Sequence, residues 1–469
     1  MMQGKTAIVL FSDDFRINDN PALYNACQNY QNIIPMYIYQ EDYLGRKLGT
    51  ASKVFLHNVL NSFDKLLLTQ FNIRLIIQKG DSIEVLKETL KKTRFDAIYF
   101  NESYTLNQIE NEDKIKNYFN HLDVRCFKAK LLFHPSEIKP SSKTGSTSTI
   151  NGVNAANHKF YKVFTPFAKQ CLKNTHLIEE IYEKPQKINS VHNIKGVEVL
   201  QLNLIPKKQG LWHEKLITHW TFSFDEIENN FINFLENKLK FYKENRNIPS
   251  NKGTANISAY LRFGILSPKI CFNAVMLAIA NQCLNETENN QFVFELLWRE
   301  FAYHVMFFNQ NIANQELRPE YKNFQWNDSQ DFLSKFLSKW QKGQTGFDIV
   351  DAGMNELWHT GVMHNRIRMV VASFLTKDLL INWRHGEQWF WDTLVDADPA
   401  VNPFSWQWVF GSGFDAAPYF RIFNPTSQKQ KFDNNNLYCK KWLNSNWKAD
   451  MIVNHDIQRK IALERYKNL

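Results

Sequence analysis

Hydrophobic and polar positions alternate between two spacings over the first 130 residues. Short, almost continuously apolar runs indicate buried strands at 6–11, 33–39, 74–78, 96–100 and 124–127. Amphipathic stretches between them indicate helices that open at Pro21 and then cover 51–70, 82–92 and 107–120. Apolar strands separated by helices are typical of a parallel sheet covered on both faces. We therefore predict a doubly wound, Rossmann-like α/β domain over residues 1–130.

The pattern changes between residues 131 and 210. Residues 140–149 are polar and rich in Ser and Thr, and one apolar island follows at 161–167. Polar stretches of this composition are typical of loops. We predict a long connector whose apolar island packs onto one of the domains.

Helical spacing dominates from residue 211 to residue 469. Helices are predicted over 222–245, 257–263, 268–280, 292–308, 332–342, 348–359, 364–380 and 386–394. The expected fold class is therefore α/β followed by an all-α domain. No apolar run reaches the ~18–20 residues that a membrane-spanning helix needs, so no membrane association is expected.

Composition narrows the class of protein without locating a site. The chain is 44% hydrophobic and 22% charged, which is ordinary for a globular protein and argues against global disorder. Six scattered cysteines without a C-x-x-C pair, and a start that runs directly into an apolar strand, predict a cytoplasmic protein without a metal site. The net charge of +9 and the 13 tryptophans favour a polyanionic partner and stacking surfaces, which have to be sought in local clusters.

One predicted helix carries three different polar functions on one face. Asn365, Arg368 and Met369 lie at i, i+3 and i+4, and Arg366 projects from another face. A turn that contains Asp396 and Asp398 follows. Because buried carboxylates need partners, Arg368 is expected to pair with Asp396, although both carboxylates could also cap the next helix.

That next helix is rich in tryptophan. Asn402 and Trp406 share a face at i and i+4, whereas Trp408 lies ~200° from Trp406 around the helix. The two indoles therefore serve different cavities. One is expected to be internal and the other to face a surface pocket, where it would suit stacking on a base.

Three further segments combine charged, aromatic or hydroxyl groups. Glu295, Trp298 and Arg299 share a helical face. Upstream, Tyr242 and Arg246 stand at a helix end, and the hydroxyl-rich turn 253–258 opens another helix. Free backbone N–H groups in such a turn form a natural seat for phosphate.

Taken together, these segments resemble the DNA photolyase/cryptochrome family, specifically the class I cyclobutane pyrimidine dimer (deoxyribodipyrimidine) photolyases. The resemblance covers nearly the whole chain and rests on 15–20, 161–167, 253–258, 295–301, 342–351, 363–369, 396–408 and 415–426. It implies an antenna domain over 1–130, a connector over 131–210 and a helical FAD- and DNA-binding domain over 211–469.

The resemblance implies a U-shaped FAD, active in its reduced form, in the helical domain. The implied FAD-binding residues are Tyr242, Thr254, Ala255, Asn256, Ile257, Ser258, Arg299, Arg368, Asp396, Ala397, Asp398 and Asn402. Asn402 would lie beside flavin N5. Trp406, Trp383 and Trp326 match the family's electron-transfer triad, which runs from flavin to surface.

The implied reaction is the light-driven splitting of pyrimidine dimers in UV-damaged DNA by a monomeric carbon–carbon lyase. The implied catalytic residues are Glu295, Trp298, Asn365, Met369, Asn402 and Trp408, and the two tryptophans would flank a flipped-out dimer. The implied DNA contacts are Arg246, Trp298, Asn365, Arg366, Arg421, Gln428 and Lys431.

The sequence departs from the family pattern in three places. Ser12 stands where the family usually has arginine, and Ala255-Asn256 stand where it often has Ser-Arg. Lys47, Asn107 and Gln108 stand where folate-binding relatives have His, Asn and Glu. The presence and identity of a second, antenna chromophore therefore stay open: it could be methenyltetrahydrofolate or a deazaflavin, or there could be none.

Three alternatives remain beside dimer repair. A cryptochrome would share fold and flavin, but Asn402 and the Trp298/Trp408 pair favour repair. A (6-4) photolyase would be expected to have histidines where Asn365 and Met369 stand. A nucleotide-binding α/β protein with a helical interaction domain would explain residues 1–130 but not the tryptophan triad.

Overall fold

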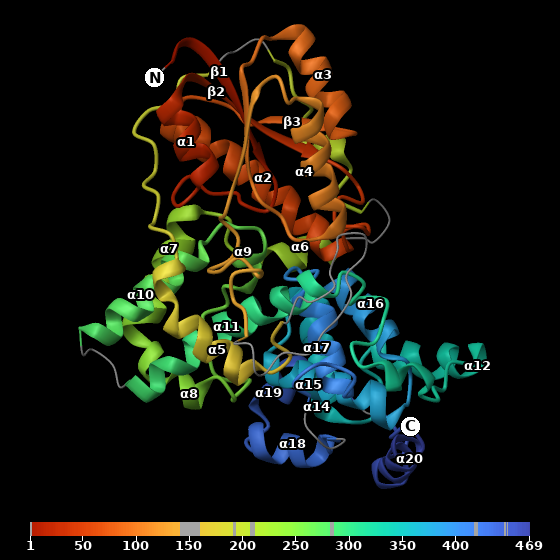
Figure 1. Cartoon of the computed structure of the whole chain (residues 1–469). Helices are drawn as coiled ribbons and strands as arrows, with labels where there is room; N and C mark the ends of the chain where they lie inside the picture. The colour runs from red at the N-terminus through yellow and green to blue at the C-terminus, as the bar shows by residue number, and fades with distance from the viewer. Residues whose placement is uncertain are drawn as a thin grey trace.

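The computed structural model describes residues 2–140, 160–190, 194–206, 212–281, 286–416, 421–444, 447 and 449–469. An α/β part lies at one end of the molecule and a larger helical part lies against it (Figure 1). This arrangement confirms the predicted fold class. No helix among the described residues is long and apolar enough to cross a membrane.

The α/β part contains one five-stranded, fully parallel sheet. Its strands are β1 (Met2–Phe11), β2 (Tyr30–Tyr39), β3 (Ile76–Lys79), β4 (Ala97–Asn101) and β5 (Asp123–Phe127), in the order β3-β2-β1-β4-β5. All five predicted strands are confirmed, with ends that shift by a few residues. The chain winds outward on both sides of β1, so the carboxyl ends of β1 and β4 flank the crevice where such sheets bind ligands.

Helices cover both faces of this sheet, as predicted. They are α1 (Pro21–Asn29), α2 (Thr50–Phe71), α3 (Ser82–Lys92) and α4 (Leu106–Tyr118). Ile8 of β1 packs in a core with residues of α3 and α4, whereas its neighbours Ala7 and Val9 pack in the core that includes α1 and α2. Alternate side chains of a strand point to opposite faces, which explains the near-continuous apolar runs.

The connector contains one helix that the sequence analysis did not predict. The apolar island at 161–167 leads into α5 (Phe164–Lys173), which docks on α11 (Glu286–Phe308) as the island's hydrophobicity required. Two 3₁₀ turns follow at Thr175–Leu177 and Val199–Leu202. All of the predicted polar loop 140–149 beyond residue 140 lies outside the described residues.

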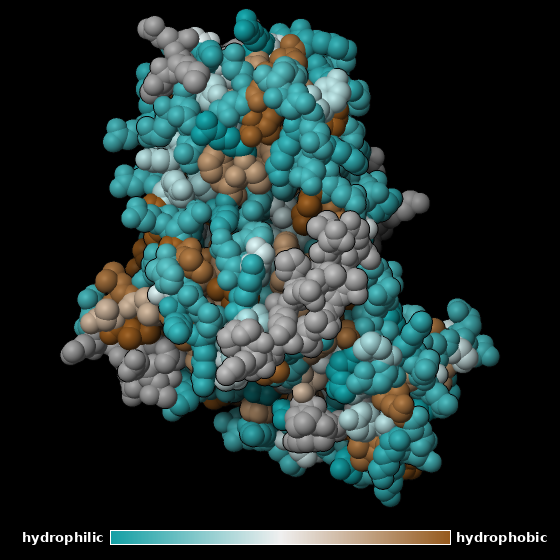
Figure 2. Space-filling model, in the orientation of Figure 1, coloured by the Kyte–Doolittle hydropathy of each residue, from teal (hydrophilic) through white to brown (hydrophobic). Residues whose placement is uncertain are grey.

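The helical part runs from α6 to α20 and includes α11. Its other helices are α6 (Trp212–Ile217), α7 (Phe224–Asn237), α8 (Tyr242–Asn245), α9 (Ser258–Arg262), α10 (Pro268–Ala280), α12 (Gln330–Phe332), α13 (Ser338–Gln341), α14 (Asp348–Thr360), α15 (Asn365–Ser373), α16 (Trp383–Thr393), α17 (Val401–Phe410), α18 (Pro425–Phe432), α19 (Leu437–Trp442) and α20 (His455–Lys467). Figure 2 shows a mostly hydrophilic face with an apolar patch over α10, where Met276 and Leu277 are exposed.

Three predicted helices are interrupted. The prediction over 222–245 is wrong as a single helix, because a 3₁₀ turn at Leu239–Phe241 separates α7 from α8 and buries Leu239 completely. The helices predicted over 332–342 and 364–380 contain π-helical turns at Leu333–Leu337 and Phe374–Asp378. Hydrophobic spacing averages over such local changes in winding, so it could not reveal them.

A buried charge cluster joins the α/β part to the helical part. Asp13 lies 2.9 Å from Lys130 and 2.8 Å from Arg262, and all three side chains are almost inaccessible to solvent. Burial alone would raise the pKa of Asp13, but the charges of Arg262 and Lys130 hold it below its usual value. Buried ion pairs therefore connect the two parts at this seam.

Candidate active site

An ion pair holds the turn after α16 against α15. Arg368 Nη2 lies 2.8 Å from Asp396 Oδ2, which confirms the pairing predicted from the sequence. The Ser258 hydroxyl also donates to this carboxylate at 2.7 Å, so the start of α9 joins the same cluster. Three segments far apart in the chain thus meet around one carboxylate.

Asp398 has a different position. Its Oδ1 accepts the amides of Ala400 and Val401 at the start of α17, and its Oδ2 accepts the Tyr303 hydroxyl at 2.7 Å. The Asp398 side chain therefore caps the start of α17, which is the alternative considered for the two carboxylates. Ala397, between the two acids, is buried, and its carbonyl accepts a hydrogen bond from Arg262.

The turn 253–258 leaves a row of backbone donors available. None of its N–H groups donates a hydrogen bond to another group in the described part of the chain. Asn256 has a φ of 51°, and its side chain accepts the Thr254 hydroxyl. Ile257 is buried, whereas Ala255 is partly exposed beside these residues. Such a turn suits an anion such as a diphosphate.

Arg299 lies at the seam between the two parts of the molecule. Its guanidinium contacts Glu300 at 3.2 Å and donates to the carbonyl of Lys130 at 3.1 Å. Tyr242 at the start of α8 is buried, with Arg246 5.7 Å from its ring. The structure therefore places these two predicted FAD-binding residues in well-packed surroundings.

Asn402 is buried and bound to a residue that the sequence analysis missed. Its amide nitrogen donates to the carbonyl oxygen of Glu387 at 3.1 Å and to the Glu387 carboxylate at 2.8 Å. The neighbouring Gly386 lies directly against the ring of Trp406, since a Cβ there would be 2.1 Å from it. Glu387 is an acidic residue within the Trp-rich segment 383–391, and this pattern could have pointed to it as a site residue.

The three tryptophans of the predicted triad differ in burial. Trp406 and Trp383 are buried, and Trp326 is half-buried. The residue after Trp326 donates its amide to the carbonyl of Leu380, near the start of α16, and the Trp326 ring lies 4.6 Å from that of Phe410. Trp326 is thus the outermost of the three in terms of burial, and the electron path through them stays a prediction.

The two tryptophans predicted to flank a base differ in their packing. Trp298 stacks on Phe164 of α5 with centroids 3.7 Å apart, so one of its ring faces is covered. Trp408 is partly exposed and donates to the carbonyl of Asp415 at 3.2 Å, whereas Trp406 is buried. The prediction of one internal indole on α17 is confirmed for Trp406, and the surface pocket predicted for the other indole stays a prediction.

Glu295 and Arg246 form an ion pair of 2.7 Å, which the sequence analysis did not foresee. Gln291 also donates to Glu295 at 3.0 Å. Burial raises the pKa of Glu295, and the charge of Arg246 and the bond from Gln291 counteract part of that rise. Glu295, predicted to contact a base, and Arg246, predicted to contact the DNA backbone, thus form an ion pair with each other.

Cations gather beside this pair. The Arg366 guanidinium lies 4.5 Å from the ring of Phe432, and the Lys431 ammonium lies 5.3 Å from the same ring. Burial and the nearby charge of Arg246 lower the pKa of Arg366, which also donates to Asn247 at 2.5 Å. The other predicted lesion or DNA contacts are exposed Asn365, partly buried Met369 at 3.8 Å from Arg366, Gln428 on α18, and exposed Arg421.

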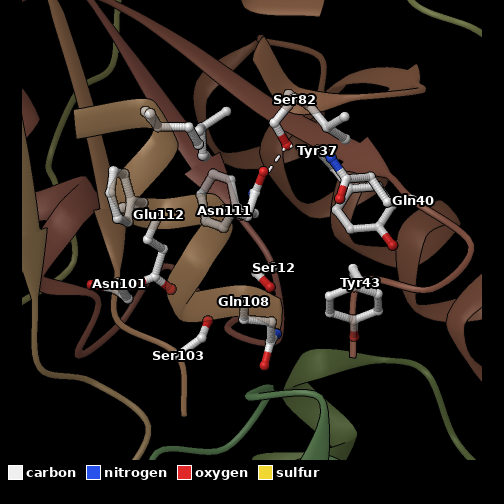
Figure 3. Close-up of a pocket in the computed structure, with 15 residues that line it drawn as sticks. Ser12, Tyr37, Gln40, Tyr43, Ser82, Asn101, Ser103, Gln108, Asn111 and Glu112 are labelled. Carbon is white, nitrogen blue, oxygen red and sulfur yellow. Dashed lines mark hydrogen bonds between the residues drawn. The ribbon is translucent and has the colours of Figure 1, made fainter. Parts of the chain in front are cut away.

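A second candidate site lies in the α/β part, at the carboxyl ends of β1, β2 and β4 (Figure 3). Ser12, Gln108 and Glu112 are among its lining residues. The amide nitrogen of Gln108 is buried and has no hydrogen-bond partner among the described groups, so the site offers a free donor. Burial raises the pKa of Glu112 to about 7. Exposed Lys47 instead pairs with Glu41 at 3.3 Å, away from this pocket.

Comparison with known proteins identifies two family regions. Residues 7–187 match the family model "DNA photolyase", and residues 292–466 match "FAD binding domain of DNA photolyase". A deoxyribodipyrimidine photo-lyase of Agrobacterium fabrum is 34% identical over 447 residues, covering 94% of this chain and 88% of the relative.

Solved structures agree in fold. A bacterial class III photolyase from Agrobacterium tumefaciens superposes with a TM-score of 0.89 at 31% identity, covering 100% of this chain and 98% of the other. An archaeal photolyase from Sulfolobus tokodaii, solved with two FAD molecules, gives 0.78 at 26% identity, covering 99% and 100%. These matches do not confirm the class I subtype. The chain belongs to the DNA photolyase family and carries that family's FAD-binding domain behind its α/β domain.

Proposed function

We propose that this protein is a deoxyribodipyrimidine photo-lyase that uses light to split cyclobutane pyrimidine dimers in UV-damaged DNA. The observation that carries the proposal is the Glu295–Arg246 ion pair, with half-buried Trp298 one turn further along α11 and Arg366, whose pKa the charge of Arg246 lowers, against the ring of Phe432. This set combines base stacking, a hydrogen-bonding acid and phosphate binding. We place the antenna domain at 1–130, the connector at 131–210 and the FAD- and DNA-binding domain at 211–469.

The residues of the helical part fit FAD. The unpaired amides of the turn 253–258 suit its diphosphate, and the pair Arg368–Asp396 with Ser258 supplies charge and hydroxyl groups beside that turn. The remaining residues proposed to hold FAD are Tyr242, Arg299, Ala397, Asp398 and Asn402. When bound and reduced, FAD supplies on excitation the electron that splits the cyclobutane ring.

The lesion has to leave the duplex to reach this site. A poorly stacked dimer flips out at lower cost than a normal base pair. Trp298 and Trp408 would stack on it, each contributing ~1–3 kcal/mol. Glu295, Asn365 and Met369 would contact its base edges, and Asn402 would complete the catalytic set.

The backbone contacts would come from the cations on the same face. Arg246, Arg366 and Lys431 are close enough to share one phosphate track, and Arg421 and Gln428 would extend it. Salt would therefore weaken binding in proportion to the number of phosphates contacted. We expect a cytoplasmic monomer acting on chromosomal DNA.

Two further roles complete the proposal. Trp406, Trp383 and Trp326 would pass an electron inward to restore reduced FAD. The pocket at Gln108 would take a second, light-harvesting chromophore, with a deazaflavin or a folate as the candidates. The free donor of Gln108 supports such a ligand, whereas the outward position of Lys47 argues against a folate held through that residue.

The test is repair by the purified, chemically reduced protein under blue light. We expect an oligonucleotide with a thymine dimer to be restored and one with a (6-4) photoproduct to stay unchanged, because Asn365 and Met369 stand where histidines would be expected. Denaturing extraction and absorption spectra of the released chromophores should show FAD. Absence of flavin after gentle purification, or no dimer reversal in the light, would overturn the proposal.

A further inference from the structure

A short segment of the α/β part docks on α16. Arg46 binds the Glu387 carboxylate through two bonds of 2.7 and 3.0 Å, and its guanidinium lies 3.4 Å from the ring centroid of Trp391. The Trp391 indole donates to the carbonyl of Lys47 at 2.8 Å. A bidentate pair that is also stacked has a fixed geometry, which a single flexible charge would not give.

Glu387 binds both Arg46 and Asn402. The Glu387 side chain is 4% exposed, and its carboxylate oxygen Oε1 accepts from both Arg46 and Asn402. The carboxylate is therefore a bridge between a cation of the α/β part and an amide of α17. Without Arg46, this buried carboxylate would keep, among the described residues, the amide of Asn402 as its hydrogen-bond donor.

This bridge decides which way the Asn402 amide points. Both acceptors on Glu387, its carbonyl and its carboxylate, face the side-chain nitrogen of Asn402, which has two hydrogens to give. The reversed amide would set its oxygen against two oxygens. The amide nitrogen of Asn402 thus donates to Glu387, and the amide oxygen points away from Glu387.

We propose that Arg46 is a positioning residue of the flavin site, which acts through Glu387 to keep the Asn402 amide oxygen turned toward the cofactor. The inference rests on the proposed function and on the place beside flavin N5 that the family resemblance implies for Asn402. That nitrogen carries a hydrogen in reduced FAD and none in oxidised FAD. A fixed acceptor oxygen therefore stabilises the reduced cofactor that repair requires, and the α/β domain contributes to it directly.

The experiment measures the two-electron reduction potential of the FAD bound to full-length variants. In Arg46→Ala and Glu387→Gln we expect a potential lower by about 30 mV, which corresponds to a roughly tenfold weaker preference for reduced FAD. Arg46→Lys keeps the charge but loses the bidentate, stacked contact, so it should shift the potential in the same direction.

Thr50→Val is the matched control at the same seam. The Thr50 hydroxyl donates to Asp392 of α16 at 2.7 Å, so this variant removes a cross-seam bond without touching Glu387 or Asn402. Its potential should equal that of the wild type. If it shifts as Arg46→Ala does, the effect is general loosening of the seam and the inference fails.

The remaining outcomes separate the inference from the proposed function. A wild-type protein that binds FAD, with unchanged potentials in Arg46→Ala and Arg46→Lys, overturns the inference alone. A wild-type protein without flavin overturns the proposed function as well. Should Arg46→Ala fail to fold, the potential of Arg46→Lys decides: a shift supports the role of Arg46, and none rejects it.

Discussion

Trp298 stacks on Phe164 with ring centroids 3.7 Å apart and ring planes 6° apart. Phe164 begins α5, in the connector between the α/β and helical parts, whereas Trp298 lies on α11. The connector therefore supports a residue that we propose to stack on the lesion. With one face of the indole covered, only the opposite face or an edge can meet a base.

Removing this indole should weaken binding to damaged DNA. Trp298→Ala is expected to cost ~1–3 kcal/mol in affinity for an oligonucleotide with a thymine dimer, because one stacking surface is lost. Phe164→Ala should cost less, about 0.5–1.5 kcal/mol, since it removes only the support behind the indole. Fluorescence anisotropy with damaged and undamaged DNA measures both, and affinity for undamaged DNA should stay the same. Equal loss on both DNAs would reject the lesion-stacking role.

Trp383 is expected to carry the electron between an inner and an outer indole. Trp383→Phe should abolish light-driven reduction of oxidised FAD, while chemically reduced enzyme should still repair dimers. Trp442→Phe, on α19 away from this path, is the control and should behave as wild type. The measurement is loss of oxidised-flavin absorption under blue light with an external reductant. Wild-type photoreduction by Trp383→Phe would exclude this route.

The elements that position the site were largely predictable from sequence. The strands follow near-continuous apolar runs, and the shared helical face of Asn365, Arg368 and Met369 predicted that Arg368 would reach Asp396. Such predictions work because both depend on local periodicity and on one strong rule, that a buried carboxylate needs a partner.

Contacts between distant segments could not be predicted in the same way. Arg46 and Glu387 are 341 residues apart, and nothing in either local pattern specifies the other. Similarly, Arg246 and Glu295 were assigned to different DNA contacts, although they pair in the structure. Side chains that meet across a seam depend on how two parts pack, and that packing is set by many weak contacts rather than by a local motif.

The Glu295–Arg246 pair predicts a pH dependence of DNA binding. Burial raises the pKa of Glu295, while Arg246 and Gln291 counteract part of the rise. When a DNA phosphate draws Arg246 away, the pKa of Glu295 should rise further, so binding takes up a proton. Affinity for damaged DNA should therefore fall as pH rises through the range in which Glu295 loses its proton.

The control for this prediction is Glu295→Gln, which cannot titrate and should bind with a flatter pH profile. Arg246→Ala should also flatten the profile, because DNA can no longer change the pKa of Glu295 by drawing Arg246 away. Titrations of damaged oligonucleotide at constant salt measure both. Identical profiles for wild type and Glu295→Gln would contradict the assignment.

His364 links stability to pH through the helix that carries Asn365, Arg366 and Arg368. Its Nδ1 accepts the amide of Arg366 at 3.2 Å and so caps α15, which requires that nitrogen to be unprotonated. Burial, together with the charges of Arg366 and Arg368, lowers the pKa of His364 from 6.5 to about 4.

Between pH 6.5 and about 4, His364 is protonated in the unfolded chain but neutral in the native chain. The contribution of neutral His364 to the free energy of unfolding is therefore complete above pH 6.5. It is lost progressively as pH falls through that window, by about 3 kcal/mol at most. His364→Asn keeps a capping acceptor but does not titrate, so its free energy of unfolding should fall less between neutral and mildly acidic pH. Urea titrations across this range measure the difference, and parallel losses in both proteins would show that His364 does not couple α15 to pH.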